Sequence, residues 1–549
     1  MEEFDKHQFI TIYLPAPTMD DMLYDKKKAL LCNRGLCCNF EMAAVGSEKS
    51  SFIDDLLETA RILKLSETEW YFLEDDEKGS ISPRNELEAL GMLYSTLSGL
   101  LVSVDCDQEF TSLTALQNIV TERLKLFAST EPAQGRDIEN CEEVEAELIA
   151  WAVEQGIQSK LKIIEFEGFG RGGAAATDIN IGDLVLEIPV ESLIYECTAL
   201  NSSMGAVLSQ LEGLSGESMA LLWTIKERQA QESKFATYFV SLPASFNTGL
   251  SFTMEGLKEL EGALVFEEIL QAKEHLRRQY DALFPALIEA FPETFPEQVY
   301  TWENFLWASE LWYSNGVKVG FPDGTFKACL IPVAGILNHS VYPHITHYSR
   351  IDAATSTLKL HAIRPCKCGE QCFLSYGALS SADLLMFYGF VLRDDNPYDT
   401  IPIELDVPEP SSSSQKSELL SRYSITSSHM LRATWLCKSA STKNSLPSRL
   451  LAALRIIFME ESELEIFDEN PRYRMISPAN EKAVFEALLA IVDPLLGPFQ
   501  NLDGHDGIAG DVDSCTNEDW DVRLAIHFKD QQRRILSSLQ RSCIKSLHE

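Results

Sequence analysis

The chain has 549 residues, 45% of them hydrophobic, which is enough for about two to four domains with large cores. Its formal net charge of −37 excludes the class of proteins that binds nucleic acid through a basic surface. The most apolar window, Leu87–Val104, holds too many polar residues to span a bilayer. We therefore expect no nucleic acid and no membrane among the partners.

Cysteine usage indicates the compartment. The thirteen cysteines are scattered and odd in number, which favours reduced thiols over a disulfide framework. The acidic start, Met1–Asp5, is unlike both a secretory signal and an Arg/Ser-rich transit peptide. These features predict a cytosolic, nuclear or stromal protein.

Residues 1–135 form a predicted N-terminal extension. Its first 50 residues show no regular pattern, and residues 51–130 are predicted to be helical. Ser82 has the character of an N-cap, and Pro83 follows it at the first helical position. Thr111–Phe127 repeats apolar residues at helical spacing. The residues of this extension indicate no chemistry, so we assign it no function.

A central domain is predicted at 140–400. A linker at 130–135 and an acidic helix, Glu142–Gln155, lead into it. Lys162–Ile194 then alternates strand-like runs with glycines, and the turn Glu167-Gly168-Phe169 lies within it. Glycines in such a turn let the backbone approach a ligand closely, but the GxGxxG spacing of a dinucleotide fold is missing.

A helical stretch, 195–312, separates this turn from a second polar cluster. Asn338-His339-Ser340 ends an apolar run abruptly. Phe373–Gly377 reads as a strand that enters a glycine turn. Leu384–Phe387 reads as a helical turn that delivers Tyr388 just before a glycine.

The side chains of this second cluster indicate a binding pocket. Asn338 offers an amide, His339 an imidazole, and Tyr376 and Tyr388 each offer an aromatic wall with one polar atom. This set suits a pocket that orients a small polar group, not a nucleophilic triad. The cysteines of Cys366–Cys372 have no evident fourth ligand, so we expect no metal.

The C-terminal part is predicted to be a helical domain at 416–545, after a Pro/Ser linker at 408–415. Ser477-Pro478 starts a helix that runs through Val492, and Asn517–Ser542 forms another. Asn501–Asp513 is rich in Asp and Gly but lacks the order and the closing Glu of an EF-hand, so we expect a loop.

Asn-His-Ser, GEQCFLSYG and FYGF, in this order and spacing, resemble the motifs of SET-domain methyltransferases. The likeness is closest to the branch of Rubisco large-subunit lysine methyltransferases and actin-histidine methyltransferases. Ile181–Pro189 fits the signature that closes the first strands of these enzymes. The resemblance implies an α+β fold: a β-rich SET domain split by the helical insert, then a helical domain that binds the protein substrate.

The resemblance also implies a reaction. It predicts S-adenosyl-L-methionine as cofactor and a non-histone protein as substrate, with a lysine nitrogen as the expected methyl acceptor. A histidine acceptor, or a non-catalytic interaction scaffold on the same fold, remains an alternative. We expect a monomer in the cytoplasm or nucleus, with the plastid stroma as a further option.

The resemblance assigns roles to individual residues. Tyr376 would line the methyl-transfer pore, Tyr388 would form a wall of the acceptor channel, and Tyr348 is a further channel candidate. The residues implied in cofactor binding are Glu167, Gly168, Phe169, Asn315, Asn338, His339 and Tyr376. Asn315 stands where the branch usually carries arginine, and an amide loses the charge-assisted pairing with a carboxylate. We therefore expect weaker cofactor binding, or a substitute cation such as Arg171 or Lys318.

Overall fold

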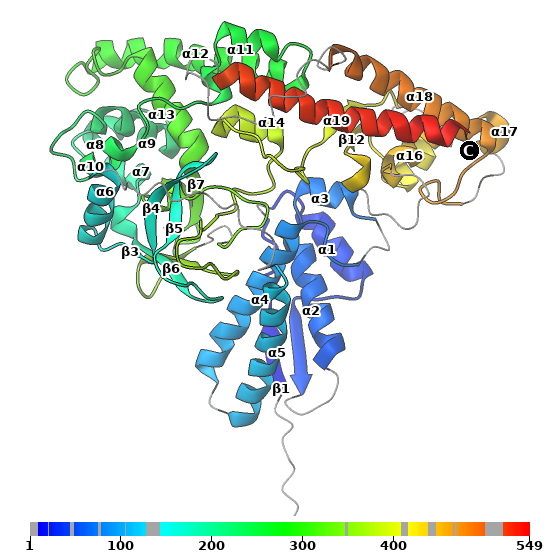
Figure 1. The fold of residues 1–549 in the computed structure, drawn as a ribbon, viewed down its shortest axis with the longest axis horizontal. Helices are drawn as coiled ribbons and strands as arrows, with labels where there is room; N and C mark the ends of the chain where they lie inside the picture. Colours follow the sequence, from blue (N-terminus) through cyan, green and yellow to red (C-terminus); the bar gives the residue numbers. More distant parts are fainter. Residues whose placement is uncertain are drawn as a thin grey trace, which may run out of the picture. The chain divides into compact units, whose positions relative to one another are not determined.

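The structure, a computed structural model, divides the chain into two units, which are described separately (Figure 1). Unit 1 comprises Met1–Glu67, Lys78–Phe246 and His275–Ala378, and unit 2 comprises Thr68–Glu77, Asn247–Glu274 and Leu379–Glu549. The described residues are 9–19, 21–43, 49–74, 78–104, 106–127, 143–345, 350–407, 415–436, 446–464, 467, 469–499 and 520–548. Among them, no helix is both long enough and apolar enough to cross a membrane.

The N-terminal part of unit 1 is more regular than predicted. Its elements are β1 (Phe9–Tyr13), α1 (Tyr24–Asn33), β2 (Asn39–Ala43), α2 (Lys49–Leu63), α4 (Pro83–Ser103) and α5 (Asp107–Lys125). The prediction that the first 50 residues are irregular was wrong, because Ile10, Ile12 and Leu14 alternate into the core while β1 pairs with β2. The predicted helix start is confirmed, since the Ser82 side chain accepts a hydrogen bond from the Asn85 N–H.

The rest of unit 1 holds the strands of the central domain. A four-stranded sheet has the order β3-β6-β10-β9, and two hairpins accompany it. Helices fill most of the insert between β6 and β7, as predicted. The bounds are α6 (Glu143–Glu154), β3 (Gln158–Ser159), β4 (Leu161–Phe166), β5 (Gly170–Ala175), β6 (Leu184–Pro189), α7 (Glu196–Leu200), α8 (Gly205–Leu208), α9 (Gly216–Glu227), α10 (Ala236–Ser241), α13 (Trp302–Asn315), β7 (Gly316–Gly320), β8 (Phe326–Leu330), β9 (Ile351–Asp352) and β10 (Thr357–His361).

Unit 2 is mostly helical, but the prediction of an all-helical tail was wrong. β12 (Ser428–Leu431) pairs antiparallel with β11 (Ile401–Glu404), which places Ile401 and Leu431 opposite each other in the core. The predicted loop Asn501–Asp513 lies outside the described residues. The helices are α11 (Met254–Glu259), α14 (Ser381–Asp383), α15 (Gln415–Arg422), α16 (Ser448–Ile457), α17 (Glu461–Leu464), α18 (Pro478–Leu496) and α19 (Trp520–His548); α12 (Leu264–Ala290) spans the division between the units.

A short segment of the N-terminal part, Thr68–Glu77, belongs to unit 2 and contains most of α3 (Glu67–Phe72). The Tyr71 hydroxyl lies 3.0 Å from Nδ1 of His429, across 358 positions of sequence. The hydroxyl of Tyr398, which is 2% exposed, donates to the Glu69 carboxylate at 3.1 Å. Both contacts are partly or fully buried, so this segment is a structural part of unit 2.

Two parts of the chain share one order of elements, which the sequence analysis did not anticipate. The first repeat, residues 9–125, runs β1-α1-β2-α2-α3-α4-α5, and the second repeat, residues 401–548, runs β11-α15-β12-α16-α17-α18-α19. In both repeats the two strands pair antiparallel and the last two helices pack on each other. An internal repeat of a supersecondary order this long indicates a duplicated domain.

The hydrogen bonds at one helix start are the same in both repeats. Ile-Ser-Pro-x-Asn-Glu occurs at 81–86 and at 476–481. Asn85 Nδ2 donates to the Arg61 carbonyl at 2.9 Å, and Asn480 Nδ2 donates to the Arg455 carbonyl at 3.0 Å. Each of these arginines then forms a bidentate pair, through Nε and Nη2, with the glutamate of its own motif. The shared motif therefore fixes how the fourth-last helix of each repeat meets the next-to-last.

A backbone feature is also repeated. Gly35 follows α1 with a φ of 66°, and Ser424 follows α15 with a φ of 51°. In each case the next residue returns its N–H to the helix, from Leu36 to Leu31 at 2.8 Å and from Ile425 to Leu420 at 2.9 Å. In the second repeat a serine adopts the left-handed conformation that a glycine adopts in the first. Because the turn is kept although this conformation is unfavourable for serine, it is part of the fold that both repeats share.

Truncation of Glu481 to alanine should destabilise unit 2 by about 3–5 kcal/mol, because it leaves the guanidinium of Arg455 buried without its carboxylate. The Arg455 side chain is 7% exposed. Urea unfolding checks this loss. The matched control is Glu469→Ala, which breaks a pair with Arg474 whose side chains are 59% and 71% exposed and should cost less than about 1 kcal/mol. Equal losses of unfolding free energy in the two variants would contradict a structural role for the Arg455–Glu481 pair.

Candidate functional site

The glycine turn of β4–β5 forms one side of the candidate site, within unit 1. Gly168 and Gly170 have φ values of 73° and 65°, which allow the tight reversal between the two strands. The Phe169 N–H closes the turn on the Phe166 carbonyl at 3.0 Å. The Phe169 ring packs edge-on against Phe373, with centroids 5.5 Å apart, so the turn is tied to the later part of the chain.

The Asn338 amide joins this turn to the second polar cluster. Its Nδ2 donates to the Arg171 carbonyl at 3.0 Å and lies 3.4 Å from the Phe169 carbonyl, across 167 and 169 positions of sequence. Leu374 donates its N–H to the Asn338 carbonyl at 2.8 Å. Three segments that the sequence analysis placed in one site thus meet at one asparagine.

His339 is buried beside Tyr376. Its Nδ1 accepts the Tyr376 N–H at 3.1 Å, and the two rings stack with centroids 5.1 Å apart. Burial lowers the pKa of His339 to about 4, so the imidazole is neutral at physiological pH. A neutral ring that accepts at Nδ1 holds its proton on Nε2, and this proton fixes the tautomer.

The Tyr376 hydroxyl has a defined orientation. It donates to the Leu337 carbonyl at 2.8 Å, on the residue just before Asn338. Because the proton is engaged there, the lone pairs of the phenol oxygen face away from that carbonyl. The ring stack and this hydrogen bond together hold the hydroxyl in one place.

The backbone before the Asn-His corner is strained. Val333 is buried and has a φ of 69°, a conformation that β-branched residues rarely adopt. Two residues later, an added Cβ at Gly335 would lie 2.9 Å from Oδ1 of Asn315. Asn315, on α13, therefore lies at the corner, where the resemblance expected it, but its Nδ2 donates to the neighbouring Ser314 hydroxyl at 2.8 Å.

Arg171 was a candidate to replace the missing arginine cation, but its guanidinium contacts groups outside the site. Its Nη1 donates to the Ser241 carbonyl at 2.6 Å and lies 3.4 Å from the Glu145 carboxylate. The backbone carbonyl of Arg171 belongs to the site, whereas its guanidinium is engaged outside it. Lys318, the other candidate, is exposed on β7.

Of the remaining predicted residues, the two channel tyrosines are not placed in the same site. Tyr388 ends a π-helical turn, Leu384–Tyr388, in unit 2, where burial and then Asp383 raise the pKa of its phenol. Tyr348 lies outside the described residues. Glu167 is exposed at the tip of the β4–β5 turn. The acceptor channel formed by Tyr388 and Tyr348 therefore stays a prediction.

Gln371 is a site residue that the sequence analysis missed. It is 1% exposed, and neither its amide nitrogen nor its amide oxygen has a hydrogen-bond partner among the described residues. An added Cβ at Gly172 would lie 2.6 Å from Gln371 Nε2 and 2.9 Å from Asn338 Nδ2, so both amides border one small cradle. A glutamine in an otherwise apolar run, Gln371–Leu374, was the available signal.

Three soft ligands also come together nearby. One ligand atom from each of His344, Cys366 and Cys372 lies within 4.8 Å of the others, and all three residues are buried. Cys368 is exposed and does not join them. The pKa of the Cys372 thiol is raised, first by its hydrogen bond with Cys366 and then by burial. The group could hold a metal ion, but it offers three ligands where structural zinc takes four.

Acid should destabilise the protein through His339. The pKa is near 6.5 when the chain is unfolded and about 4 when it is folded, so between these values the unfolded state binds more protons and stability falls as the pH falls. The full loss, reached near pH 4, is roughly 3 kcal/mol. Urea unfolding of His339→Asn across this range should show a shallower slope. Identical slopes for the native protein and His339→Asn would contradict the assignment.

Replacing Gln371 with leucine should raise the thermal unfolding midpoint. The change removes two buried amide atoms that have no hydrogen-bond partner among the described residues, and each such atom costs about 1–3 kcal/mol. The matched control is Gln371→Asn, which keeps an amide and should bring no gain. A lower midpoint for Gln371→Leu than for the native chain would mean that the amide already has a partner.

Comparison with known protein families gives two matches to one family model. A family model described as Rubisco LSMT substrate-binding matches at residues 18–155 and again at 411–536. The second match covers most of the predicted C-terminal domain. The first covers most of the extension to which the sequence assigned no function, and the two matches fall on the two structural repeats.

Curated relatives are actin-histidine N-methyltransferases. That of Mus musculus is 26% identical over 396 residues, which cover 70% of this chain and 64% of the relative. That of Homo sapiens is 27% identical over 328 residues, which cover 58% and 53%. The matched region therefore spans less than two thirds of the length of these relatives.

Solved structures establish the fold. The crystal structure of the SET domain of LSMT bound to lysine and AdoHcy matches with a TM-score of 0.56 at 20% identity, covering 73% of this chain and 91% of that one. The structure of Rubisco LSMT bound to AdoMet matches with a TM-score of 0.54 at 20% identity, covering 74% and 93%. The predicted α+β architecture is confirmed.

Proposed function

Because this chain belongs to the SET-domain branch of Rubisco large-subunit and actin-histidine methyltransferases, we propose that it is an S-adenosylmethionine-dependent protein N-methyltransferase. The observation that carries the proposal is the Asn338 amide, which ties the β4–β5 turn to the segment bearing Tyr376.

The residues present fit the cofactor. S-adenosylmethionine carries an amino acid end and an adenine, which need donors and acceptors in a site that the backbone lets them approach. The amide of Gln371 is buried beside Asn338 and Gly172 without a partner among the described residues, and an orphaned amide of this kind is typical of a ligand contact. Asn338 and Gln371, with the turn Glu167–Phe169, would hold the cofactor.

When bound, the cofactor supplies a methyl group on a positively charged sulfur. The chain must then align an acceptor nitrogen with that methyl and exclude water, since methyl transfer needs neither a metal nor a protein nucleophile. Tyr376 suits the aligning role, because its hydroxyl is held by Leu337 and its ring is stacked on neutral His339. A rigid phenol oxygen beside the reacting centre can accept a proton or hydrogen bond from the acceptor amine.

The expected acceptor is lysine. At pH 7 about one lysine in 2,500 is neutral, which costs roughly 4.6 kcal/mol, and an apolar aromatic channel reduces this cost by desolvation. The named activity of the curated relatives supports histidine as the second candidate. Histidine needs no such desolvation, because its reference pKa of about 6.5 leaves most of it neutral at pH 7. The relatives also favour a cytoplasmic protein substrate.

Tyr376→Phe should lower methyl transfer roughly 10²-fold with little change in cofactor affinity, because it removes one positioned hydroxyl and keeps the ring. Incubation of the purified protein with labelled S-adenosylmethionine and cell extract measures the transfer, and calorimetry measures the affinity. Mass spectrometry of the product identifies lysine or histidine as acceptor.

The control is Tyr313→Phe, an exposed tyrosine on α13, which should label normally. Absence of labelling by the native protein in all extracts, together with absence of cofactor binding, would refute the proposed function.

A further inference from the structure

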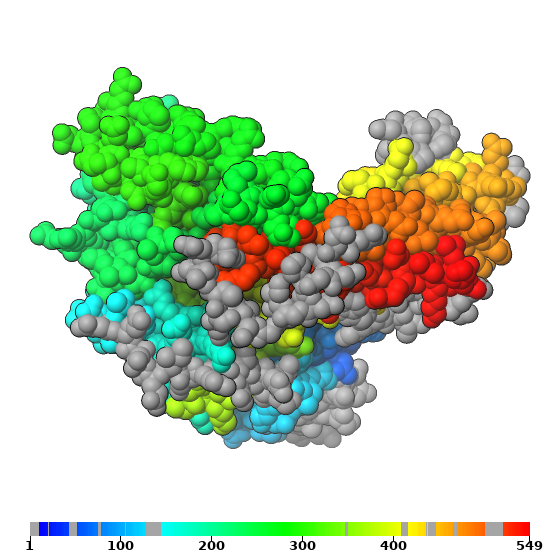
Figure 2. Space-filling model, turned by 45° about the horizontal axis from the view of Figure 1, so that its top comes forward, coloured from blue at the N-terminus to red at the C-terminus, as the bar shows by residue number. Residues whose placement is uncertain are grey.

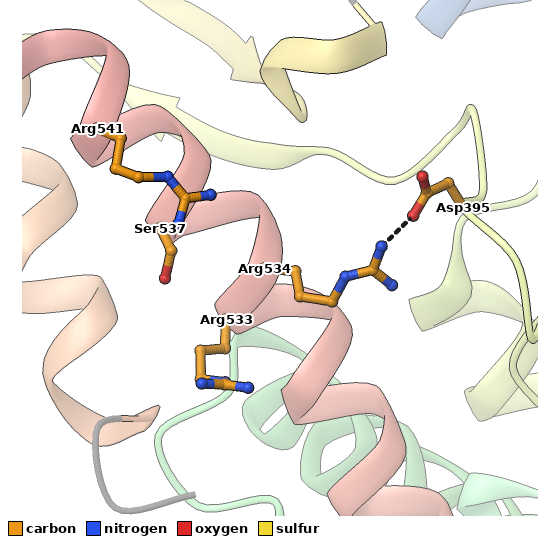
Figure 3. A pocket seen from close by; sticks show the side chains of 5 residues that line it. All are labelled: Asp395, Arg533, Arg534, Ser537 and Arg541. Carbon is orange, nitrogen blue, oxygen red and sulfur yellow. Dashed lines mark hydrogen bonds and ion pairs between the residues drawn. The ribbon is translucent and has the colours of Figure 1, made fainter. Parts of the chain in front are cut away.

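One helix of unit 2 carries a pocket lined by positive charge. A cavity of about 340 Å³ is lined by Asp395, Arg533, Arg534, Ser537 and Arg541. Figure 3 shows that the last four come from one stretch of α19, whereas Asp395 reaches the cavity from a separate loop. In a space-filling view α19, in red, lies at the surface beside α18, in orange (Figure 2).

The three guanidinium groups are not equally engaged. Arg534 pairs with Asp395 at 2.9 Å, and Arg533 pairs with Asp530 on its own helix at 2.8 Å. For Arg541 no ion pair or hydrogen bond is found within the described part of the chain, and its side chain is exposed. Arg533 and Arg534 thus each have a carboxylate partner, whereas Arg541 has none among the described residues.

The first repeat provides an internal control for this pocket. The register of the last two helices is set by the same hydrogen bond in both repeats: Gln117 Nε2 donates to Ser98 Oγ at 2.8 Å, and Gln540 Nε2 donates to Asp493 Oδ1 at 2.8 Å. Counted from these glutamines, the positions of Arg533, Arg534 and Arg541 in the second repeat correspond to Phe110, Thr111 and Asn118 in the first.

The fold that the two repeats share therefore does not depend on these three arginines. The bidentate Arg–Glu pair, the serine N-cap and the left-handed turn occur in both repeats, whereas the positions of the three arginines hold uncharged residues in the first repeat. Features that differ between copies of one fold are those free to serve binding. Guanidinium groups in a row suit carboxylates, which they pair with in bidentate geometry.

We propose that the pocket of Arg533, Arg534 and Arg541 binds a carboxylate-rich segment of the protein substrate. The inference rests on the proposed function for the identity of the partner, and it deepens that function by naming the chemistry of the docking segment. The negative charge of the rest of the chain repels an acidic protein at long range, so this local site would select the orientation in which such a partner docks.

The test uses a fluorescein-labelled decaglutamate peptide and the full chain, with binding followed by fluorescence anisotropy. The native protein should bind, and binding should weaken as salt is raised. Arg541→Glu should weaken binding at least tenfold, because it reverses the charge of the guanidinium that has no ion-pair partner among the described residues. The matched control is Arg474→Glu, which reverses an exposed arginine of the same repeat outside the pocket and should bind within about twofold of the native protein.

The outcomes separate this proposal from the proposed function. If the native protein does not bind the peptide, or if both variants weaken peptide binding equally, the proposed role of the pocket is refuted. Unchanged thermal unfolding of Arg541→Glu shows that its loss of binding is not a loss of fold. The binding assay contains no methyl donor, so it does not depend on catalysis. If the native protein binds the peptide but labels no extract, the proposed methyltransferase activity is refuted and the proposed binding pocket is not. With an active enzyme, Arg541→Glu should raise the KM for the protein substrate.

Discussion

The hydrogen bonds of one amide hold the candidate site together. Asn338 donates to the β4–β5 turn and accepts from Leu374 through its backbone, so the three segments that build the site meet at a single residue. The surrounding groups depend on that meeting. His339 and Tyr376 stack on each other only because the corner is fixed, and the strained Val333 shows that the fold accepts a local cost to place it.

The helix starts could be predicted from the sequence because helix capping depends on residues that are close in sequence. Ser82-Pro83 and Ser477-Pro478 each satisfy the first N–H groups of a helix within three residues, and no distant partner is needed. The short strands were not readable, since β1, β2 and β12 become strands only through pairing with a partner elsewhere. Four or five residues of alternation are too few to outweigh the polar residues around them.

The residues of the candidate site also separate into those that the sequence could predict and those that it could not. Asn338, His339 and Tyr376 could be named because their motifs fall in a recognisable order, and the structure brings them together. Gln371 could not be named, because the property that marks it is burial without a partner, and burial is a result of tertiary packing. The duplication had a visible signature in the repeated Ile-Ser-Pro-x-Asn-Glu, but its meaning depends on the matching ion pairs that surround it.

The segment Thr68–Glu77 gives the chain an unusual order of assembly. Tyr71 and Glu69 are synthesised more than 300 residues before their partners His429 and Tyr398. Unit 2 can therefore be completed only after residues far apart in the sequence have both been made, although domains generally fold as units in the order of synthesis. A shortened chain that begins after the first repeat would lack a piece of this unit, and the nascent protein must keep that piece available until its partners have been synthesised.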